Sequence, residues 1–221
     1  MQEERIRQNF LRIQEEIAPY RLNIIAVTKY FDESAIEAAY RAGLRNFGES
    51  RAVEAVEKIQ RLSDELKNNS KFHFIGHLQT NKVKKVIGVF DLIHSVDSYK
   101  LAEIISEEAL KHGKVQDILL QLNNAGEIQK FGYSKESLLE DFPKIKALPG
   151  VNVLGLMNMA PLGAEEKTLE NLFADVVAFR DELQNKFNCE LKDISMGMSQ
   201  DYKIAARCGS TMLRIGRKLF E

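Results

Sequence analysis

The sequence predicts an α/β fold, a single (β/α)8 barrel of the TIM type over residues 1–221 with an extra helix at its amino terminus. Short apolar runs alternate with amphipathic stretches along most of the chain, the apolar runs number eight, and Gly43, Gly88, Gly113 and Pro149-Gly150 mark the joints. Strict alternation predicts parallel strands with helices outside them, and eight such units are the number that closes a barrel.

The elements follow one another in a regular order. A helix is expected over residues 2–17, before the first strand. Strands are expected near 22–28, 44–47, 72–76, 91–95, 116–121, 151–156, 191–196 and 211–215. Helices are expected near 32–42, 50–66, 80–88, 98–112, 134–147, 165–186 and 199–207. Only five residues follow Gly216, which is too few for an eighth outer helix, so the amino-terminal helix could cover that gap. An open doubly wound sheet is the alternative, but no GxGxxG follows the first strand.

Composition excludes several classes of protein. The chain carries 31 Lys and Arg against 32 Asp and Glu, and no window combines basic and aromatic residues, so we expect no nucleic-acid partner. No apolar run reaches the roughly 20 residues that span a bilayer, so we expect no membrane association. Cys189 and Cys208 lack metal-ligand spacing and fit a reducing compartment. With a charged amino terminus, the chain is expected to be cytoplasmic.

Polar and small residues gather where the predicted strands end, and in a barrel those ends meet on the face that holds the chemistry. Lys29 closes the first apolar run, directly before a helix that Asp32 is placed to cap. A lysine there is usually a solvated charge, and polar loops are also ordinary surface. Asn46, His77, Met157 and Arg214 stand near the ends of other strands.

The last two strands are followed by segments suited to a phosphate. Ser199 is placed to cap a helix that begins near Gln200, and Gly216 would let backbone amides approach an anion. Loops after the seventh and eighth strands are the usual phosphate grip of such barrels. The alternative is that Ser199 is only a helix cap and that the glycines only form turns.

A phosphate-binding site opposite an isolated lysine is what pyridoxal 5′-phosphate (PLP) needs. The lysine amine attacks its aldehyde, the phosphate anchors the far end, and a group near the ring nitrogen sets how strongly the ring draws electrons. Arg214 could fill that last role. An arginine only donates hydrogen bonds, which would keep the ring nitrogen unprotonated and weaken the electron sink.

Six segments carry a resemblance to a known family. They are AVTKY, NFGES, FHFIGHLQTNKVK, IHSVDS, VLGLMNMAP and MGMSQDYKIAARCGSTMLRIG. In collinear order, from about Asn23 to Phe220, the chain resembles the pyridoxal phosphate homeostasis proteins, also called the proline synthetase co-transcribed family. One departure is visible, since the family usually has Asn where Ser50 follows Glu49 here.

The resemblance implies a fold-type III barrel like the alanine racemase N-terminal domain, with PLP held as an internal aldimine on Lys29. It further implies that Ser199, Gly216 and Arg217 hold the phosphate and that Arg214 faces the ring nitrogen. Asn46, His77 and Met157 would line the ring, although His77 could instead only stabilise a turn and Met157 could plug the barrel. Apo forms of PLP-dependent enzymes would be transient clients.

Two function classes remain. The first is a non-catalytic protein that stores, buffers or delivers PLP and so affects amino-acid and keto-acid balance. The second is a fold-type III enzyme such as an amino-acid racemase, which needs two bases on opposite faces of the substrate. The second base usually comes from a separate β-domain at a dimer interface, and five residues after Gly216 leave no room for one. We therefore favour the non-catalytic class and expect a monomer.

Overall fold

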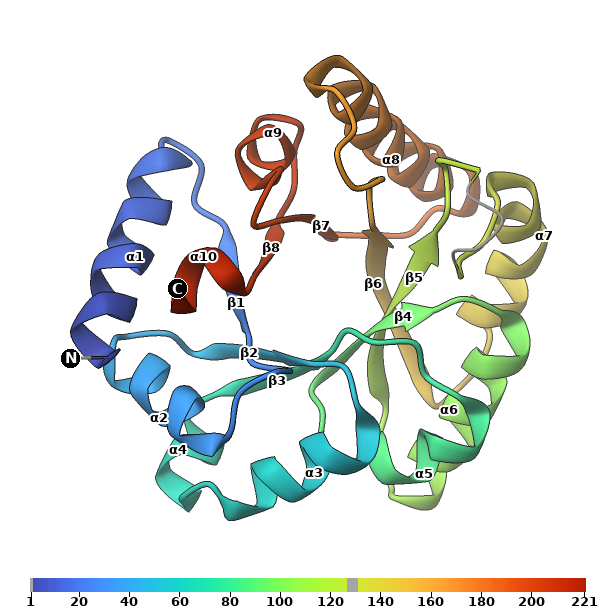
Figure 1. The fold of residues 1–221 in the computed structure, drawn as a ribbon. Coiled ribbons are helices and arrows are strands. Elements are labelled where there is room, and N and C mark those ends of the chain that lie inside the picture. Colours follow the sequence, from blue (N-terminus) through green and yellow to red (C-terminus); the bar gives the residue numbers. More distant parts are fainter. Residues whose placement is uncertain (1, 127–130) are drawn as a thin grey trace.

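The computed structural model describes residues 2–126 and 131–221 of the chain. Its strands form one closed barrel in which each strand is parallel to the next and β8 pairs with β1 (Figure 1). The strands are β1 (Asn23–Val27), β2 (Asn46–Glu49), β3 (Lys71–Phe74), β4 (Leu92–Val96), β5 (Gln116–Leu122), β6 (Val151–Asn158), β7 (Asp193–Met198) and β8 (Met212–Ile215). The predicted fold class is therefore confirmed.

Helices surround this barrel and join successive strands (Figure 1). They are α1 (Gln2–Glu16), α2 (Glu33–Arg41), α3 (Ala52–Arg61), α4 (Asp64–Asn68), the 3-10 turn η1 (Thr80–Lys82), α5 (Val83–Val86), α6 (Tyr99–Lys111), α7 (Lys135–Lys146), α8 (Glu166–Phe187), α9 (Tyr202–Arg207) and α10 (Arg217–Phe220). No helix within residues 2–126 and 131–221 has the length and apolar character needed to cross a membrane.

Several boundaries differ from those that the sequence predicts. The expected helix over 50–66 is two helices, because Ser63 interrupts it and its Oγ accepts a hydrogen bond from the Leu66 amide at the start of α4. The expected second strand over 44–47 is instead β2, which starts and ends two residues later. Strands β6 and β7 each continue two residues beyond their expected ends, to Asn158 and Met198. A strand buried on both faces carries no alternation to mark where it stops.

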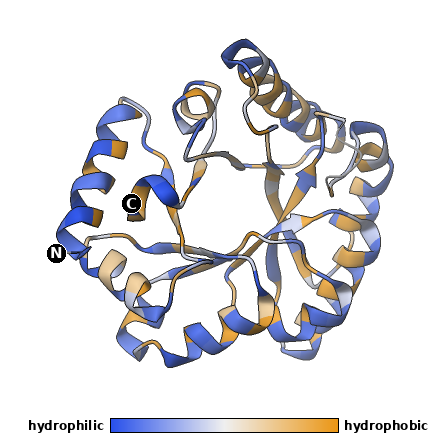
Figure 2. Cartoon of the chain, viewed as in Figure 1, coloured by the Kyte–Doolittle hydropathy of each residue, from blue (hydrophilic) through white to orange (hydrophobic). Residues whose placement is uncertain are grey.

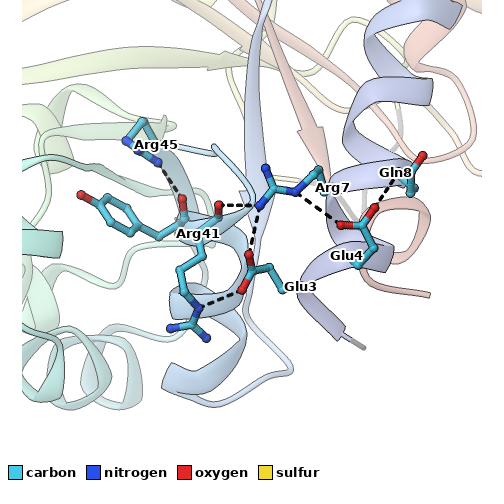
Figure 3. Close-up of polar contacts among 7 residues, drawn as sticks. Glu3, Glu4, Arg7, Gln8, Arg41 and Arg45 are labelled. Atoms are coloured by element: carbon cyan, nitrogen blue, oxygen red, sulfur yellow. Dashed lines mark hydrogen bonds and ion pairs between the residues drawn. The ribbon is translucent and has the colours of Figure 1, made fainter.

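Helix α1 packs where an eighth outer helix would otherwise lie, as expected. The Asn9 side chain donates to the Leu219 carbonyl of α10 at 3.0 Å, and Glu16 pairs with Lys203 of α9 and Lys218 of α10. On its other side α1 meets α2, where Glu3 pairs with Arg41 at 3.1 Å (Figure 3). Figure 1 shows the short α10 between α1 and β1.

Apolar side chains fill two layers. The larger layer lies between the strands and the helices, and the helix faces turned toward the strands are the hydrophobic ones (Figure 2). A second, smaller cluster lies inside the barrel and consists of Ile25, Leu92, Leu119, Met157 and Met212. Because side chains alternate along a strand, this inner cluster tells which positions of β1, β4, β5, β6 and β8 point into the barrel.

Candidate functional site

Lys29 stands at the mouth of the barrel. It lies in the turn that directly follows β1, two residues beyond Val27. The residue is half-buried, and its Nζ lies 5.0 Å from the centroid of the Tyr30 ring. The amine makes no hydrogen bond or ion pair with any of residues 2–126 and 131–221. It is therefore available to a ligand.

A buried ion pair fixes the backbone directly before Lys29. Lys58 Nζ donates to Glu49 Oε1 at 2.7 Å and to the Thr28 carbonyl at 3.0 Å, while Thr28 Oγ1 donates to the same carboxylate oxygen at 2.7 Å. Glu49, Lys58 and Thr28 are all buried. Breaking such a pair by removing one partner costs about 3–5 kcal/mol, so the end of β1 is held in one position.

Arg214, on β8, is buried inside the barrel. Its Nη1 donates to the Ser195 carbonyl and to Ser195 Oγ, each at 2.7 Å, and its Nη2 donates to the Asn158 carbonyl at 2.8 Å. A guanidinium has five N–H donors, so two remain unused among the described residues. Burial lowers the pKa of Arg214 to about 10, against the attraction of Asp201, and the group stays charged at neutral pH.

A chain of buried hydrogen bonds continues from Arg214 across the barrel. Ser195 Oγ lies 2.9 Å from His94 Nδ1, His94 Nε2 lies 3.0 Å from His73 Nδ1, and His73 Nε2 lies 3.1 Å from Asn46 Oδ1. Burial lowers the pKa of His73 to about 4. Burial, reinforced by His73 and Arg214, also holds the pKa of His94 well below its usual range. Both imidazoles are neutral at pH 7.

Three members of this hydrogen-bonded path, His73, His94 and Ser195, were not found from the sequence. A signal was present, because each stands in the middle of an apolar run where a polar side chain would be buried. Site residues were expected at and just after the strand ends. Asn46 and Arg214 lie within β2 and β8, as they do in the strands expected over 44–47 and 211–215. Met157 was expected just after the sixth strand but lies within β6, which extends two residues further than its pattern indicates.

The segments after β7 and β8 come together. Ser199 Oγ accepts a hydrogen bond from the Lys218 amide at 3.4 Å, which joins the two segments beside Gly216 and Arg217. Arg217 is exposed, and its guanidinium has no partner in residues 2–126 and 131–221. A hydroxyl, a glycine turn and an unpaired cation thus lie at one place, which suits an anion.

Ser199 does not cap α9, so that prediction was wrong. The helix begins at Tyr202, its N-cap residue is Asp201, and no side chain caps it. A turn intervenes, in which Asp201 Oδ1 accepts from the Met198 amide at 2.5 Å. Gly197 explains why the chain can make this turn. Its φ is +92°, and an added Cβ would lie 2.5 Å from the Ala205 side chain.

His77 and Met157 have different surroundings. The His77 ring stacks on Phe131, with centroids 3.6 Å apart and planes 12° apart, and its Nδ1 lies 3.3 Å from Asp97. Met157 is fully buried in the inner cluster. Their contact with a cofactor ring stays a prediction. No group of three or more His, Cys, Asp or Glu residues in the described part of the chain is arranged to hold a metal ion.

Comparison with known proteins identifies the family. A family model described as alanine racemase, N-terminal domain, matches residues 1–220. The pyridoxal phosphate homeostasis protein of Aquifex aeolicus is 40% identical over 197 residues, which are 89% of this chain and 85% of that protein. The chain belongs to the pyridoxal phosphate homeostasis protein family. The resemblance found in the sequence is thereby confirmed.

Solved structures agree with this family assignment. PipY of Synechococcus elongatus has been solved with PLP bound, and it matches with a TM-score of 0.89 at 35% identity over 98% of this chain and 100% of that one. The alanine racemase of Clostridium difficile matches with a TM-score of 0.79 at 14% identity, over 98% of this chain and 56% of that one. The second match shows a shared fold alone.

The buried histidines predict a pH dependence of stability. When pH falls below about 6.5 the unfolded chain protonates His73, whereas the folded protein resists until about pH 4. The contribution of His73 to the free energy of unfolding is fully present above pH 6.5, and about 3 kcal/mol of it is lost as the pH falls toward 4. Urea unfolding at several pH values should show that the free energy of unfolding depends less steeply on pH in His73→Gln than in the wild type. His112→Gln, at an exposed position, should keep the wild-type slope; equal slopes for wild type and His73→Gln would contradict the prediction.

Proposed function

We propose that this chain binds PLP covalently through Lys29 and acts in PLP homeostasis as a non-catalytic, monomeric carrier in the cytoplasm. One observation carries the proposal. A lysine amine that makes no hydrogen bond or ion pair with residues 2–126 and 131–221 stands at the barrel mouth, in a fold whose relative PipY has been solved with PLP bound. The names of the curated relatives support the homeostatic role. Apo forms of PLP-dependent enzymes would be transient clients.

The side chains present fit this cofactor. PLP carries an aldehyde, a phosphate and a ring nitrogen that can accept a hydrogen bond. Lys29 offers an amine. Within the described residues Arg217 offers a cation without a partner, and Arg214 offers two N–H donors that make no hydrogen bond. Asn158 Oδ1 is also buried without a partner in that part of the chain. A buried polar atom left so is costly, which supports a ligand or water beside it.

The chain's own residues would bind and orient. When bound, PLP supplies an aldehyde for the lysine and an electron-withdrawing ring. Ser199, Gly216 and Arg217 would hold its phosphate, while Arg214 would donate to the ring nitrogen. Because a guanidinium that remains charged does not accept a proton, Arg214 would keep that nitrogen unprotonated. Asn46, His77 and Met157 would line the ring.

Amino-acid racemisation is the second candidate, favoured by the barrel shared with alanine racemase. Racemisation needs two bases on opposite faces of the substrate's α-carbon, and Lys29 could be one of them. The imidazoles of His73 and His94 use their ring nitrogens within the buried chain. An unprotonated ring nitrogen would also weaken carbanion stabilisation. Carrier function is therefore the better supported reading.

The first test is covalent labelling. Incubation with PLP, borohydride reduction and peptide mass mapping should place a pyridoxyl group on Lys29, and Lys29→Ala should lose it. The free energy of unfolding of the variant should lie within about 0.5 kcal/mol of the wild-type value, because the amine makes no hydrogen bond or ion pair with the described residues. Lys84→Ala, which removes an exposed lysine of α5, is the control and should label normally. Reduction onto another lysine, with Lys29 unmodified, would refute the assignment.

The phosphate grip is tested separately. Ser199→Ala and Arg217→Ala should each weaken PLP binding by about 1.5–3 kcal/mol, the contribution of a hydrogen bond to a charged group. Equilibrium dialysis measures the change. Arg207→Ala is the matched control, since Arg207 is exposed on α9 and pairs with Glu166. If both site variants bind PLP as tightly as the wild type, the phosphate lies elsewhere.

Catalysis is tested directly. With PLP bound and alanine supplied, chiral chromatography should detect no conversion between the enantiomers beyond that of free PLP. The reason is that His73 and His94 use their ring nitrogens within the buried chain and that the electron sink expected beside Arg214 is weak. Sustained turnover that Lys29→Ala abolishes would decide in favour of the racemase.

A further inference from the structure

Five polar side chains form one hydrogen-bonded path through the barrel interior, from Arg214 on β8 through Ser195, His94 and His73 to Asn46 on β2. We propose that Ser195, His94 and His73 are positioning residues that turn both ends of this path, Arg214 and Asn46, into hydrogen-bond donors toward a 3-hydroxypyridine ring. The inference rests on the proposed function and extends it to the ionic form of the cofactor that the site selects.

The direction of the path follows from its two ends. Asn46 Oδ1 only accepts, so His73 must donate to it from Nε2. His73 is neutral and its Nδ1 therefore accepts from His94 Nε2. By the same step His94 Nδ1 accepts the Ser195 hydroxyl proton. At the other end Arg214 can only donate, and Ser195 Oγ accepts from it. Each hydrogen bond of the path therefore has one direction, and each imidazole carries its ring proton on Nε2.

A reversed path is blocked by geometry. It would leave His73 Nε2 without a proton and facing Asn46 Oδ1, so that two acceptors would lie 3.1 Å apart. Burial of both imidazoles opposes their protonation. His94 is fully buried and His73 is 5% exposed, so water does not separate them. A fully satisfied buried network of this kind holds one arrangement rigidly.

The strand register brings the two ends of the path to one level. Ile25 of β1 pairs with Asn46 on one side and with Arg214 on the other. Neighbouring strands lie about 4.8 Å apart, so the two backbones flank β1 at a separation of about 10 Å. Lys29 follows on that same central strand. A single aromatic ring held by Lys29 would thus lie between the two ends.

Both ends then present donors. The side-chain oxygen of Asn46 accepts from His73, so its Nδ2 is left to donate. Nδ2 has no partner in residues 2–126 and 131–221. Arg214 keeps two N–H groups beyond its three bonds. A ring edge that offers two acceptors, an unprotonated ring nitrogen and a deprotonated phenolic oxygen, complements this pair. The site would therefore favour that ionic form of PLP and disfavour the form with a protonated ring nitrogen.

The test uses the full chain loaded with PLP and compares His94→Leu, Ser195→Ala and His94→Gln. Gln can accept from Ser195 and donate to His73, so it preserves the direction of the path, whereas Leu cannot. In His94→Leu and Ser195→Ala we expect about tenfold weaker PLP binding. We also expect the pH midpoint of the bound-cofactor absorption band to move by about half a unit or more. His94→Gln should stay near the wild type in both.

Two further measurements separate positioning from general stability. Ser106→Ala removes another buried serine, which lies on α6 outside this path and whose Oγ accepts from the Gly150 amide, and it should lower only thermal stability. Nitrogen-15 NMR of the wild type should find both buried imidazoles protonated on Nε2 alone. This second measurement needs no variant and so stands even if His94→Leu fails to fold.

The outcomes distinguish the two proposals. If PLP is reduced onto Lys29 but His94→Leu and Ser195→Ala keep the wild-type affinity and titration, the positioning role is overturned. Protonation of either buried imidazole on Nδ1 also overturns it. If the wild type takes up no PLP, the proposed function fails and the ligand named here fails with it, whatever the NMR tautomers.

Discussion

The pairing of β8 with β1 is the constraint on which the rest of the structure depends. It closes the barrel, and it sets Arg214 against Ile25 in the same register that sets Asn46 against Ile25 from β2. A shift of one residue would turn Arg214 out of the barrel, because side chains alternate along each strand. The segment after β8 would then no longer meet Ser199 after β7. The arrangement of the site is therefore a consequence of closure and register.

Closure also creates an unusual interior. The apolar cluster inside the barrel is small, with the five side chains of Ile25, Leu92, Leu119, Met157 and Met212, and the same interior holds a polar path that contains a buried cation. Arg214 has no carboxylate in direct contact among the described residues, and carbonyl and hydroxyl oxygens accept its hydrogen bonds. An isolated charge in a protein interior is expensive, which explains why every group around it is either neutral or an acceptor.

Much of the fold could be predicted from the sequence, because alternation of apolar runs and helical patterns survives tertiary packing. The gap beside α10 and its cover by α1 followed from counting residues after the last strand. Strand ends could not be found as well, since β6 and β7 are buried on both faces and show no change of pattern at Asn158 or Met198. That error placed Met157 just after its strand instead of within it.

The candidate site was predicted unevenly for the same reason. Lys29 is recognisable because it interrupts an apolar run at a helix start, and Ser199 and Gly216 belong to a local segment. His73, His94 and Ser195 are polar residues inside strands, and their partners lie 19 to 101 residues away. No local pattern carries such pairings, because they depend on barrel register and on contact across the barrel.

The electrostatics of the interior bear on whether this barrel holds or transforms a cofactor. An enzyme that stabilises a carbanion gains from a ring nitrogen that carries a proton, which needs a carboxylic acid or carboxylate beside it. Here the path from Arg214 to Asn46 contains no acid, and two neutral imidazoles separate its ends. Proton donation to a ring nitrogen would have to come from a guanidinium whose pKa is about 10. The same interior that would orient PLP firmly would thus leave its ring a weak electron sink, and this combination suits a protein that binds PLP for later use.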